Sequence, residues 1–347
     1  LKASFTERIK KIMTTYKIKI QSSGEEFEIK PSQTILEGAI AAGITIPYGC
    51  QDGACGSCKG KIISGKFFLN DHQSSALTES DIKLGMTLYC KTMAQEDLVI
   101  EPNIPDMYDE YSPKFYPVRV ESLANLNHDV MQMYLKLPAS ETLKFKAGQY
   151  IEFLMADGSR RAFSMANAPH ESMIELHLRL IEGGKFTSFV FNEMKEKSIH
   201  RIEGPIGQFY LRASDKPIVF IAGGTGFAPI KSIIEDMIFT KNERKVYLYR
   251  GVRSKEDLYM ADLVTDWNKK LKNLNYIPVI EDGLSEKVRS GFVHHAVLED
   301  FKNLSDVQIY CCGAPGLVEN AFIDLTKNGL PENQFFADAF TFAPKKK

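Results

Sequence analysis

The sequence lacks long apolar runs, has few cysteines and carries almost no net charge. No stretch approaches the roughly eighteen apolar residues of a membrane helix, and residues 1–13 lack the apolar block of a secretory signal. We therefore expect a cytoplasmic chain without stable membrane insertion. A formal net charge of −1 leaves no global field to attract nucleic acid, so no nucleic-acid partner is expected. Six cysteines in 347 residues are too few for a disulfide scaffold, which favours metal or redox chemistry.

The length and composition fit an ordinary globular protein of two or three domains. Hydrophobic residues make up 44% and charged residues 25%, which is typical of folded domains. Residues 101–113 hold three prolines and several acids without periodicity, which predicts an interdomain linker. The pattern changes again near Pro217, where apolar strand-like runs begin to alternate with helical stretches. We therefore predict domains at 14–104, 114–213 and 214–347.

Each predicted domain has its own periodicity. Residues 16–29 alternate apolar and polar side chains around a Ser-Ser-Gly turn, which predicts a hairpin. Residues 35–43 have helical spacing and end on Gly43, a residue suited to a left-handed C-cap. The middle domain shows short alternating runs between turns, which indicates an antiparallel β-barrel or sandwich. The last domain alternates β-rich runs with helices, which predicts a parallel α/β sheet.

Four of the six cysteines have the spacing of a plant-type 2Fe-2S site. The predicted ligands are Cys50, Cys55, Cys58 and Cys90. The first three form C-x4-C-x2-C, and the fourth follows after 31 intervening residues. Gly53, Gly56 and Gly60 are expected to take positive φ and to bring backbone N–H groups close to the sulfurs. A structural zinc site is the alternative, although zinc sites usually use paired C-x2-C units. Together with the hairpin and helix before it, this region resembles the β-grasp ferredoxin domain.

The tetrapeptide Arg161-Ala162-Phe163-Ser164 resembles the R-x-[YF]-[ST] signature of the ferredoxin reductase superfamily. The resemblance implies an FAD cofactor in the middle domain, which would then be a β-barrel. It assigns the diphosphate to Arg161, stacking near the isoalloxazine to Phe163, and a hydrogen bond to flavin N5 to Ser164. The superfamily more often has Tyr at the position of Phe163, so a phenol hydrogen bond to the flavin is absent here.

A Gly-Gly turn further along precedes a helix-like segment. We expect Gly184, Lys185 and Thr187 to bind the flavin diphosphate at the helix N-terminus, with Thr187 as the cap. Simple helix initiation is the alternative interpretation. On the strand before this turn, His177 and Arg179 either line the flavin or occupy surface-strand positions.

A glycine-rich loop follows the strand-like run PIVFIA and opens a helix expected to begin near Ile230. Its residues are Gly223, Gly224, Thr225 and Gly226. The bare backbone can approach a pyrophosphate, and the loop resembles the G-G-T-G-x-A-P element of the same superfamily; tight packing is the alternative. A later run ends in Cys311-Cys312-Gly313, which resembles the superfamily's C-G-x-P element. That resemblance places Cys312 beside nicotinamide C4 and Gly313 in the cofactor loop, while Cys311 should face the core.

Arg250 and Arg253 lie at and beyond the end of a strand-like run, near the expected adenosine ribose. They either bind a 2′-phosphate or are surface charges. Acidic neighbours disfavour the phosphate, so NADH is favoured over NADPH. Near the chain end, Asp338 and Phe340 match positions where relatives place an acid and a final aromatic near the flavin. Phe340 therefore either shields the ring or belongs to a core strand.

The whole chain resembles the reductases that serve oxygenases and deoxysugar dehydratases, particularly the CDP-6-deoxy-Δ3,4-glucoseen reductase subfamily. This resemblance implies that NADH or NADPH is oxidised, hydride passes to FAD, and single electrons leave through the 2Fe-2S cluster to a separate protein acceptor. Cys312 and Ser164 are the predicted catalytic residues, acting by position. The alternatives are a flavin or quinone reductase with a diffusible acceptor, a non-enzymatic redox sensor, and a zinc-stapled binding module.

Overall fold

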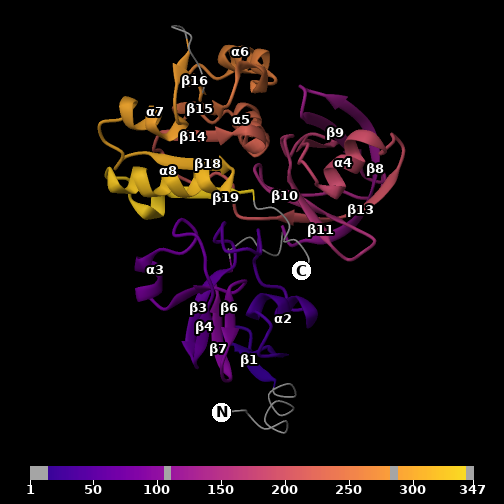
Figure 1. Ribbon diagram of the computed structural model, residues 1–347, viewed down its shortest axis with the longest axis vertical. Helices are drawn as coiled ribbons and strands as arrows, with labels where there is room; N and C mark the ends of the chain where they lie inside the picture. The colour runs from indigo at the N-terminus through magenta and orange to yellow at the C-terminus, as the bar shows by residue number, and fades with distance from the viewer. Residues whose placement is uncertain (1–14, 105–110, 282–287, 341–347) are drawn as a thin grey trace. The chain divides into compact units, whose positions relative to one another are not determined.

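The computed structural model describes residues 15–104, 111–281 and 288–340 (Figure 1). The chain divides into two compact units, Leu1–Tyr108 and Asp109–Lys347. Part of the predicted linker, the extension before the first strand and the terminal lysines lie outside the described residues. No helix in the described ranges is long and apolar enough to cross a membrane.

The first unit is built on a mixed five-stranded sheet in the order β2-β1-β7-β3-β5. The central pair β1 and β7 is parallel, and the other neighbours are antiparallel. A separate two-stranded sheet pairs β4 with β6. The strands are β1 (Tyr16–Ile20), β2 (Glu26–Ile29), β3 (Lys59–Ser64), β4 (Phe67–Leu69), β5 (Met86–Leu88), β6 (Thr92–Ala94) and β7 (Leu98–Pro102), and the helices are α2 (Ile35–Ala41) and α3 (Glu79–Lys83). A mixed sheet with one helix packed on it is the β-grasp arrangement, as the sequence predicts.

Helix α2 shows why this unit folds as the pattern predicts. Thr34 accepts a hydrogen bond from the backbone of Glu37, whose side chain in turn accepts one from the backbone of Thr34, so a capping box fixes the helix start. Ile35 and Leu36 are buried in the core with β1 and β2. Gly43 ends the segment at φ +72°, the left-handed conformation expected of it.

The second unit begins with an antiparallel barrel. Its strands follow the order β11-β10-β13-β8-β9-β12, and a bridge between Met165 and Leu176 joins the two ends of this sheet, which closes it. Inward-facing apolar side chains fill the interior. The elements are β8 (Lys114–Asn125), β9 (Val130–Lys136), β10 (Tyr150–Leu154), β11 (Arg160–Ser164), β12 (Ile174–Arg179), α4 (Lys185–Asn192) and β13 (Ile199–Ile206).

A six-stranded parallel sheet completes the second unit, in the order β17-β16-β15-β14-β18-β19. Helices α5 and α6 pack together on one face, and α7 and α8 on the other (Figure 1). The strands are β14 (Ile218–Gly223), β15 (Val246–Val252), β16 (Leu274–Ile280), β17 (Arg289–Ser290), β18 (Gln308–Gly313) and β19 (Phe335–Ala339). The helices are α5 (Phe227–Phe239), α6 (Ala261–Lys270), α7 (Val293–Asp300) and α8 (Pro315–Lys327), with 3-10 turns at Gly224–Gly226, Lys255–Asp257 and Glu332–Gln334.

The strand order of this sheet reverses between β14 and β18. From β14 the chain proceeds outward through β15 and β16, and it then returns to place β18 on the other side of β14. In open α/β sheets such a reversal leaves a crevice at the carboxyl ends of the two central strands, where ligands bind. Both loops that the sequence singles out, after β14 and at the end of β18, lie at this crevice.

Candidate cofactor and active sites

The four predicted cluster ligands lie in one loop and one turn of the first unit, and their sulfurs pair two by two. The Cys50 and Cys55 side chains are hydrogen-bonded to each other, and so are those of Cys58 and Cys90. The Cys55 sulfur also accepts the backbone N–H of Cys50 at 3.2 Å, and the Cys58 sulfur that of Cys90 at 3.5 Å. These ligands are brought together because the chain returns through β5 to the loop that precedes β3.

This pairing fits two irons better than one zinc ion. A tetrahedral zinc site with Zn–S bonds of about 2.3 Å holds its sulfurs about 3.8 Å apart. Within the described residues, groups of three ligand atoms that all lie within 4.8 Å of one another are formed by histidines with carboxylates, and none by cysteines. Two separated pairs are the arrangement that a 2Fe-2S cluster requires, because each iron takes two thiolates.

The backbone of the cysteine loop favours thiolates. The N–H groups of Asp52 and Ala54 donate to the Cys50 sulfur at 3.4 and 3.2 Å. The hydrogen bond from Cys55, which outweighs burial, and these N–H groups lower the pKa of Cys50 to about 6. Gly53 and Gly56 take φ of +75° and +73°, as predicted, and so turn the loop toward the sulfurs.

The prediction for Gly60 is wrong. This residue lies in β3 and does not take positive φ. A Cβ at this position would overlap the ring of Tyr89, so the glycine is needed for packing against that ring and not for a turn.

The predicted flavin residues Arg161, Phe163 and Ser164 lie together on β11, the first strand in the order of the barrel sheet. Phe163 packs against Phe186 of α4 at a ring-centroid distance of 5.5 Å. Arg161 is half-buried, and its guanidinium donates to the neighbouring backbone carbonyl of Arg160 at 2.7 Å. The Ser164 side chain points to the opposite face of the strand from Arg161 and Phe163 and is buried.

Thr187 is not the N-cap of α4. The helix begins at Lys185 with Gly184 as its N-cap, because Gly183 at φ +70° tightens the preceding turn and starts the helix earlier than predicted. Thr187, inside the first turn, accepts from the Ile181 N–H at 3.1 Å and donates back to the Gly184 carbonyl. The free N–H groups of this first turn still suit a diphosphate.

His177 is fully buried, so the surface-strand interpretation is wrong for it. Its ring nitrogens contact Glu175 at 2.9 Å and the Tyr259 hydroxyl at 3.1 Å. Burial lowers the pKa of His177 even though Glu175 opposes this shift. Arg179 pairs with Asp129 at 2.7 Å. His177 through Tyr259, and Arg179 through Asp257 at 3.9 Å, connect the barrel with the part of the second unit that follows β15.

A buried ion network joins the barrel to helix α5. Lys231 lies 2.8 Å from Glu175 of β12 and 2.8 Å from Glu235, and it also donates to the carbonyl of Ala166. Burial alone would raise the pKa of Glu175, but the hydrogen bond from His177 and the charge of Lys231 lower it to about 2. Sequence reasoning missed this network, although a lysine inside the apolar run FAPIKSII is an available signal.

The glycine loop after β14 lies against the end of β18. Ala222 is in register with Cys312, and a Cβ on Gly226 would overlap the Cys312 carbonyl oxygen. Gly224 takes φ +54°, and a Cβ there would lie 2.8 Å from the Arg179 guanidinium. Helix α5 begins at Phe227, earlier than the predicted Ile230, because a 3-10 turn over Gly224–Gly226 leads directly into it. A loop of this kind at a helix N-terminus suits a pyrophosphate, because the first N–H groups of a helix have no partner within it.

The structure brings Ser164 of the barrel and Cys312 of the parallel sheet to one carboxylate. The Ser164 hydroxyl donates to Asp338 Oδ2 at 3.4 Å, and the Cys312 sulfur lies 4.0 Å from the same oxygen. All three side chains are buried. Burial, the nearby Asp338 and Cys311 raise the pKa of Cys312 well above that of a free thiol, so it is a neutral thiol and not a nucleophile.

Two further predictions concern the ends of β15 and β19. Arg250 is fully buried with its guanidinium 3.9 Å from the Phe227 ring centroid, so it is not a surface charge, whereas Arg253 is exposed. Two Arg250 nitrogens, Nε and Nη2, have no hydrogen-bond partner. Phe340 packs at the margin of the core, and its backbone N–H donates to the Gly313 carbonyl at 2.8 Å. Cys311 is buried, as expected.

Three family models match the chain in sequence order. They are a 2Fe-2S iron-sulfur cluster binding domain at residues 18–95, an oxidoreductase FAD-binding domain at 117–210 and an oxidoreductase NAD-binding domain at 220–322. The cluster domain contains the four paired cysteines. The other two domains contain the β11 residues and the glycine loop. The three predicted cofactors, 2Fe-2S, FAD and a nicotinamide nucleotide, are confirmed by these matches.

Individual relatives match over nearly their whole length. A CDP-6-deoxy-L-threo-D-glycero-4-hexulose-3-dehydrase reductase from Yersinia pestis is 39% identical over 93% of this chain and 98% of its own. A terephthalate 1,2-dioxygenase reductase component from Comamonas sp. is 34% identical over 95% and 98%. Among solved structures, the Amycolatopsis cytochrome P450 reductase GcoB matches with a TM-score of 0.74 at 26% identity, covering 94% of this chain and 99% of that one.

Proposed function

Since this chain belongs to the family of iron-sulfur flavoprotein reductases that includes hexulose-dehydrase and oxygenase reductases, we propose that its electron acceptor is a deoxysugar dehydrase. The chain is an NAD(P)H-dependent oxidoreductase that transfers electrons to a partner protein. The observation that carries the choice of partner is the full-length match at 39% identity to a reductase named for a hexulose dehydrase, against 34% for one named for a dioxygenase.

Each group of residues has a separate task in this proposal. The first turn of α4, with Gly184, Lys185 and Thr187, supplies N–H groups for the flavin diphosphate, together with Arg161. Phe163 provides an apolar surface beside the ring, and His177 holds β12 in place. On the other side of the crevice, the loop Gly223–Gly226 receives the pyrophosphate of the nicotinamide nucleotide.

The reacting centre is proposed to lie beside Ser164, Cys312 and Asp338. FAD, when bound, takes up two electrons as hydride and releases them one at a time. Ser164 would hydrogen-bond the flavin edge while Asp338 orients its hydroxyl. Cys312 and Gly313 keep the opposite side small, so that donor and acceptor can approach closely. Phe340, anchored through its backbone to Gly313, would cover the ring.

NADH is the proposed donor. The buried guanidinium of Arg250 contacts the Tyr259 carbonyl at 2.6 Å and is not exposed to a ribose phosphate. Arg253 is exposed, but Glu256 and Asp257 lie close by in sequence, and their negative charge opposes a 2′-phosphate. We also propose a cytoplasmic location, because none of the six cysteines, all of which lie in the described ranges, is in a disulfide, as in a reducing compartment.

An anaerobic NADH titration followed by absorbance tests the electron path. Sequential bleaching of flavin and iron-sulfur bands is expected, followed by reoxidation when a hexulose dehydrase is added. A spectrum that does not respond to NADH, as a redox sensor or binding module would give, contradicts the proposal. Reoxidation by a dioxygenase but not by the dehydrase would overturn the choice of partner alone.

Loss of one cluster ligand separates this function from that of a flavin or quinone reductase. In Cys90→Ala, NADH oxidation with ferricyanide should persist, while electron delivery to the dehydrase should fall to background. The matched control is Cys311→Ala, which removes a buried cysteine of the other unit and should leave the iron-sulfur absorbance intact. Undiminished delivery by Cys90→Ala would show that the cluster is not on the path.

A further inference from the structure

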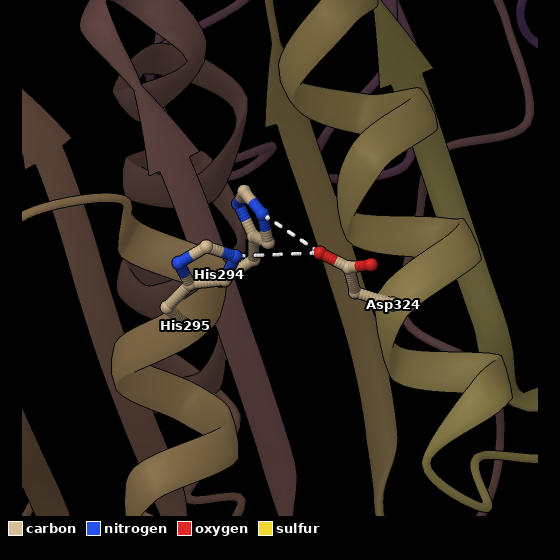
Figure 2. A group of neighbouring side chains, drawn as sticks. All are labelled: His294, His295 and Asp324. Carbon is tan, nitrogen blue, oxygen red and sulfur yellow. Dashed lines mark ion pairs between the residues drawn. The ribbon is translucent and has the colours of Figure 1, made fainter.

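Two histidines and one carboxylate converge on the face of the parallel sheet covered by α7 and α8. Figure 2 shows His294 and His295 of α7 pointing toward Asp324 of α8. The Nε2 atom of His294 lies 3.2 Å from Asp324 Oδ2, and that of His295 lies 3.4 Å from the same oxygen. The three ligand atoms all lie within 4.8 Å of one another.

These separations suit a small divalent cation. Zinc binds imidazole nitrogen and carboxylate oxygen at about 2.0–2.2 Å, so the edges of its coordination tetrahedron are about 3.3 Å long. The two nitrogen-to-oxygen distances already have this length. Two imidazoles and one carboxylate are also a ligand set that zinc takes in proteins, with water in the fourth position.

The charges around the group favour a cation. In the parts of the chain that the structure describes, the Asp324 carboxylate contacts the two imidazoles and forms no ion pair with a lysine or arginine. Neutral imidazole is the form of histidine that ligates metal. The other triad of this kind, His128 with Asp129 and Asp257, differs because Arg179 already pairs with both acids, at 2.7 and 3.9 Å.

The exposure of the three side chains gives an ion access from one side. His294 is 5% exposed, whereas His295 is 52% and Asp324 36% exposed. The Nδ1 atom of His294 is buried, so Nε2, which faces Asp324, is the ring nitrogen available to an ion that enters from the exposed side. Helix α7 packs closely on the sheet, because a Cβ on Gly251 of β15 would lie 2.8 Å from the Cβ of Val293.

We propose that His294, His295 and Asp324 bind one Zn²⁺ ion that clamps α7 to α8. This site is separate from the four cysteines and from the crevice between β14 and β18. It takes no part in electron transfer, because zinc has no redox chemistry. Its effect is to fix two helices on one face of the nucleotide-binding sheet.

Equilibrium dialysis of the full-length holoprotein against micromolar zinc tests this site, with any affinity tag removed and metals counted by mass spectrometry. One zinc per chain is expected, with the iron content unchanged, so that the cysteines are not the ligands. His295→Ala and Asp324→Asn should each weaken zinc binding by more than about tenfold, since even residues that only support metal ligands have effects of that size. His128→Ala is the matched control and should bind zinc like the unaltered chain.

A second measurement distinguishes the loss of a zinc ligand from misfolding of the variant. Both substituted side chains are partly exposed, and retained flavin and iron-sulfur absorbance will verify that the variants fold. Zinc should raise the melting temperature of the unaltered chain but not that of Asp324→Asn, because a ligand that binds only the folded state stabilises it. Equal zinc uptake by all variants would identify adventitious surface binding, and no uptake by the unaltered chain would likewise overturn the proposal.

Discussion

At the scale of single residues, Gly226 sets how closely the two loops of the crevice approach. Its backbone is in the ordinary helical region, at φ −57°, so a side chain there would be excluded by contact and not by backbone strain. A Cβ would overlap the carbonyl oxygen of Cys312. Because backbone atoms cannot give way as a flexible side chain can, any substitution would push the loop away from β18.

Gly226→Ala should therefore destabilise the second unit by about 1–3 kcal/mol and slow flavin reduction by NADH. Urea unfolding followed through Trp267, the single tryptophan of the chain, and stopped-flow absorbance measure the two effects. Gly316→Ala on α8 is the control, because a Cβ there meets nothing within 4 Å. Equal stability and equal reduction rates in both variants would show that the loops can separate without cost.

Residues close in sequence were the predictable part of the site. The three cysteines of one loop were found by their spacing, and the β11 tetrapeptide and the glycine loop by their resemblance to superfamily motifs, because each set lies in one short segment of the chain. The contact of Ser164 with Asp338 joins positions 174 residues apart and depends on how barrel and sheet pack. Gly60 was misinterpreted for a similar reason. A side chain is excluded there by the ring of Tyr89, which lies 29 residues further along the chain, so no local pattern reveals it.

At the scale of elements, helix α5 is tied to barrel strand β12 by a buried lysine between two carboxylates. Removing one member of such a network leaves charges buried without compensation. Lys231→Met should therefore lower the free energy of unfolding by about 3–5 kcal/mol, measured by urea titration with Trp267 as reporter. The surface pair of Asp266 with Lys269 offers the control, and Lys269→Met should change stability by less than about 0.5 kcal/mol.

The same network makes stability depend on pH in a definite direction. The folded pKa of Glu175, about 2, lies below its ordinary value of 4.5, so its contribution is fully present above pH 4.5. As pH falls from about 4.5 toward 2, the folded protein loses this stabilisation, which amounts to about 3 kcal/mol. Unfolding measured across that range should show a steeper acid loss for the unaltered chain than for Glu175→Gln. An equally steep loss of stability with falling pH in both proteins would contradict the assignment of this contribution to Glu175.

The helices and strands lie where the sequence predicts them, but the positions at which two helices begin differ from the prediction. The barrel, the parallel sheet and α2 occur where alternation and caps predict them. Helices α4 and α5 both begin a few residues early, because turns with left-handed glycines, Gly183 and Gly224, lead directly into them. Lys231 was missed for another reason: its partner Glu175 lies on a different domain, so its burial becomes evident only when the two domains pack.

At the scale of the whole molecule, the chain consists of two units that each have their own core. All four proposed cluster ligands lie in the first unit, and the proposed flavin and nucleotide residues lie in the second. A chain that starts at residue 109 should therefore bind FAD and oxidise NADH with ferricyanide, while failing to deliver electrons to a protein acceptor. Full-length Cys90→Ala is the comparison and should behave alike. A fragment that holds no flavin would show that the second unit depends on the first.

The burial of Cys312 affects which cysteines of this protein are oxidised in air. Reduced flavoproteins leak electrons to oxygen, and the peroxide formed attacks thiolates far faster than thiols. Cys312 and Cys311 are both shielded from water, and burial raises the pKa of each, so they remain protonated. Cys312, which we propose lies beside the flavin, thus reacts slowly with peroxide, and oxidative damage should begin at the cysteine loop of the first unit, where Cys50 and Cys55 are partly exposed.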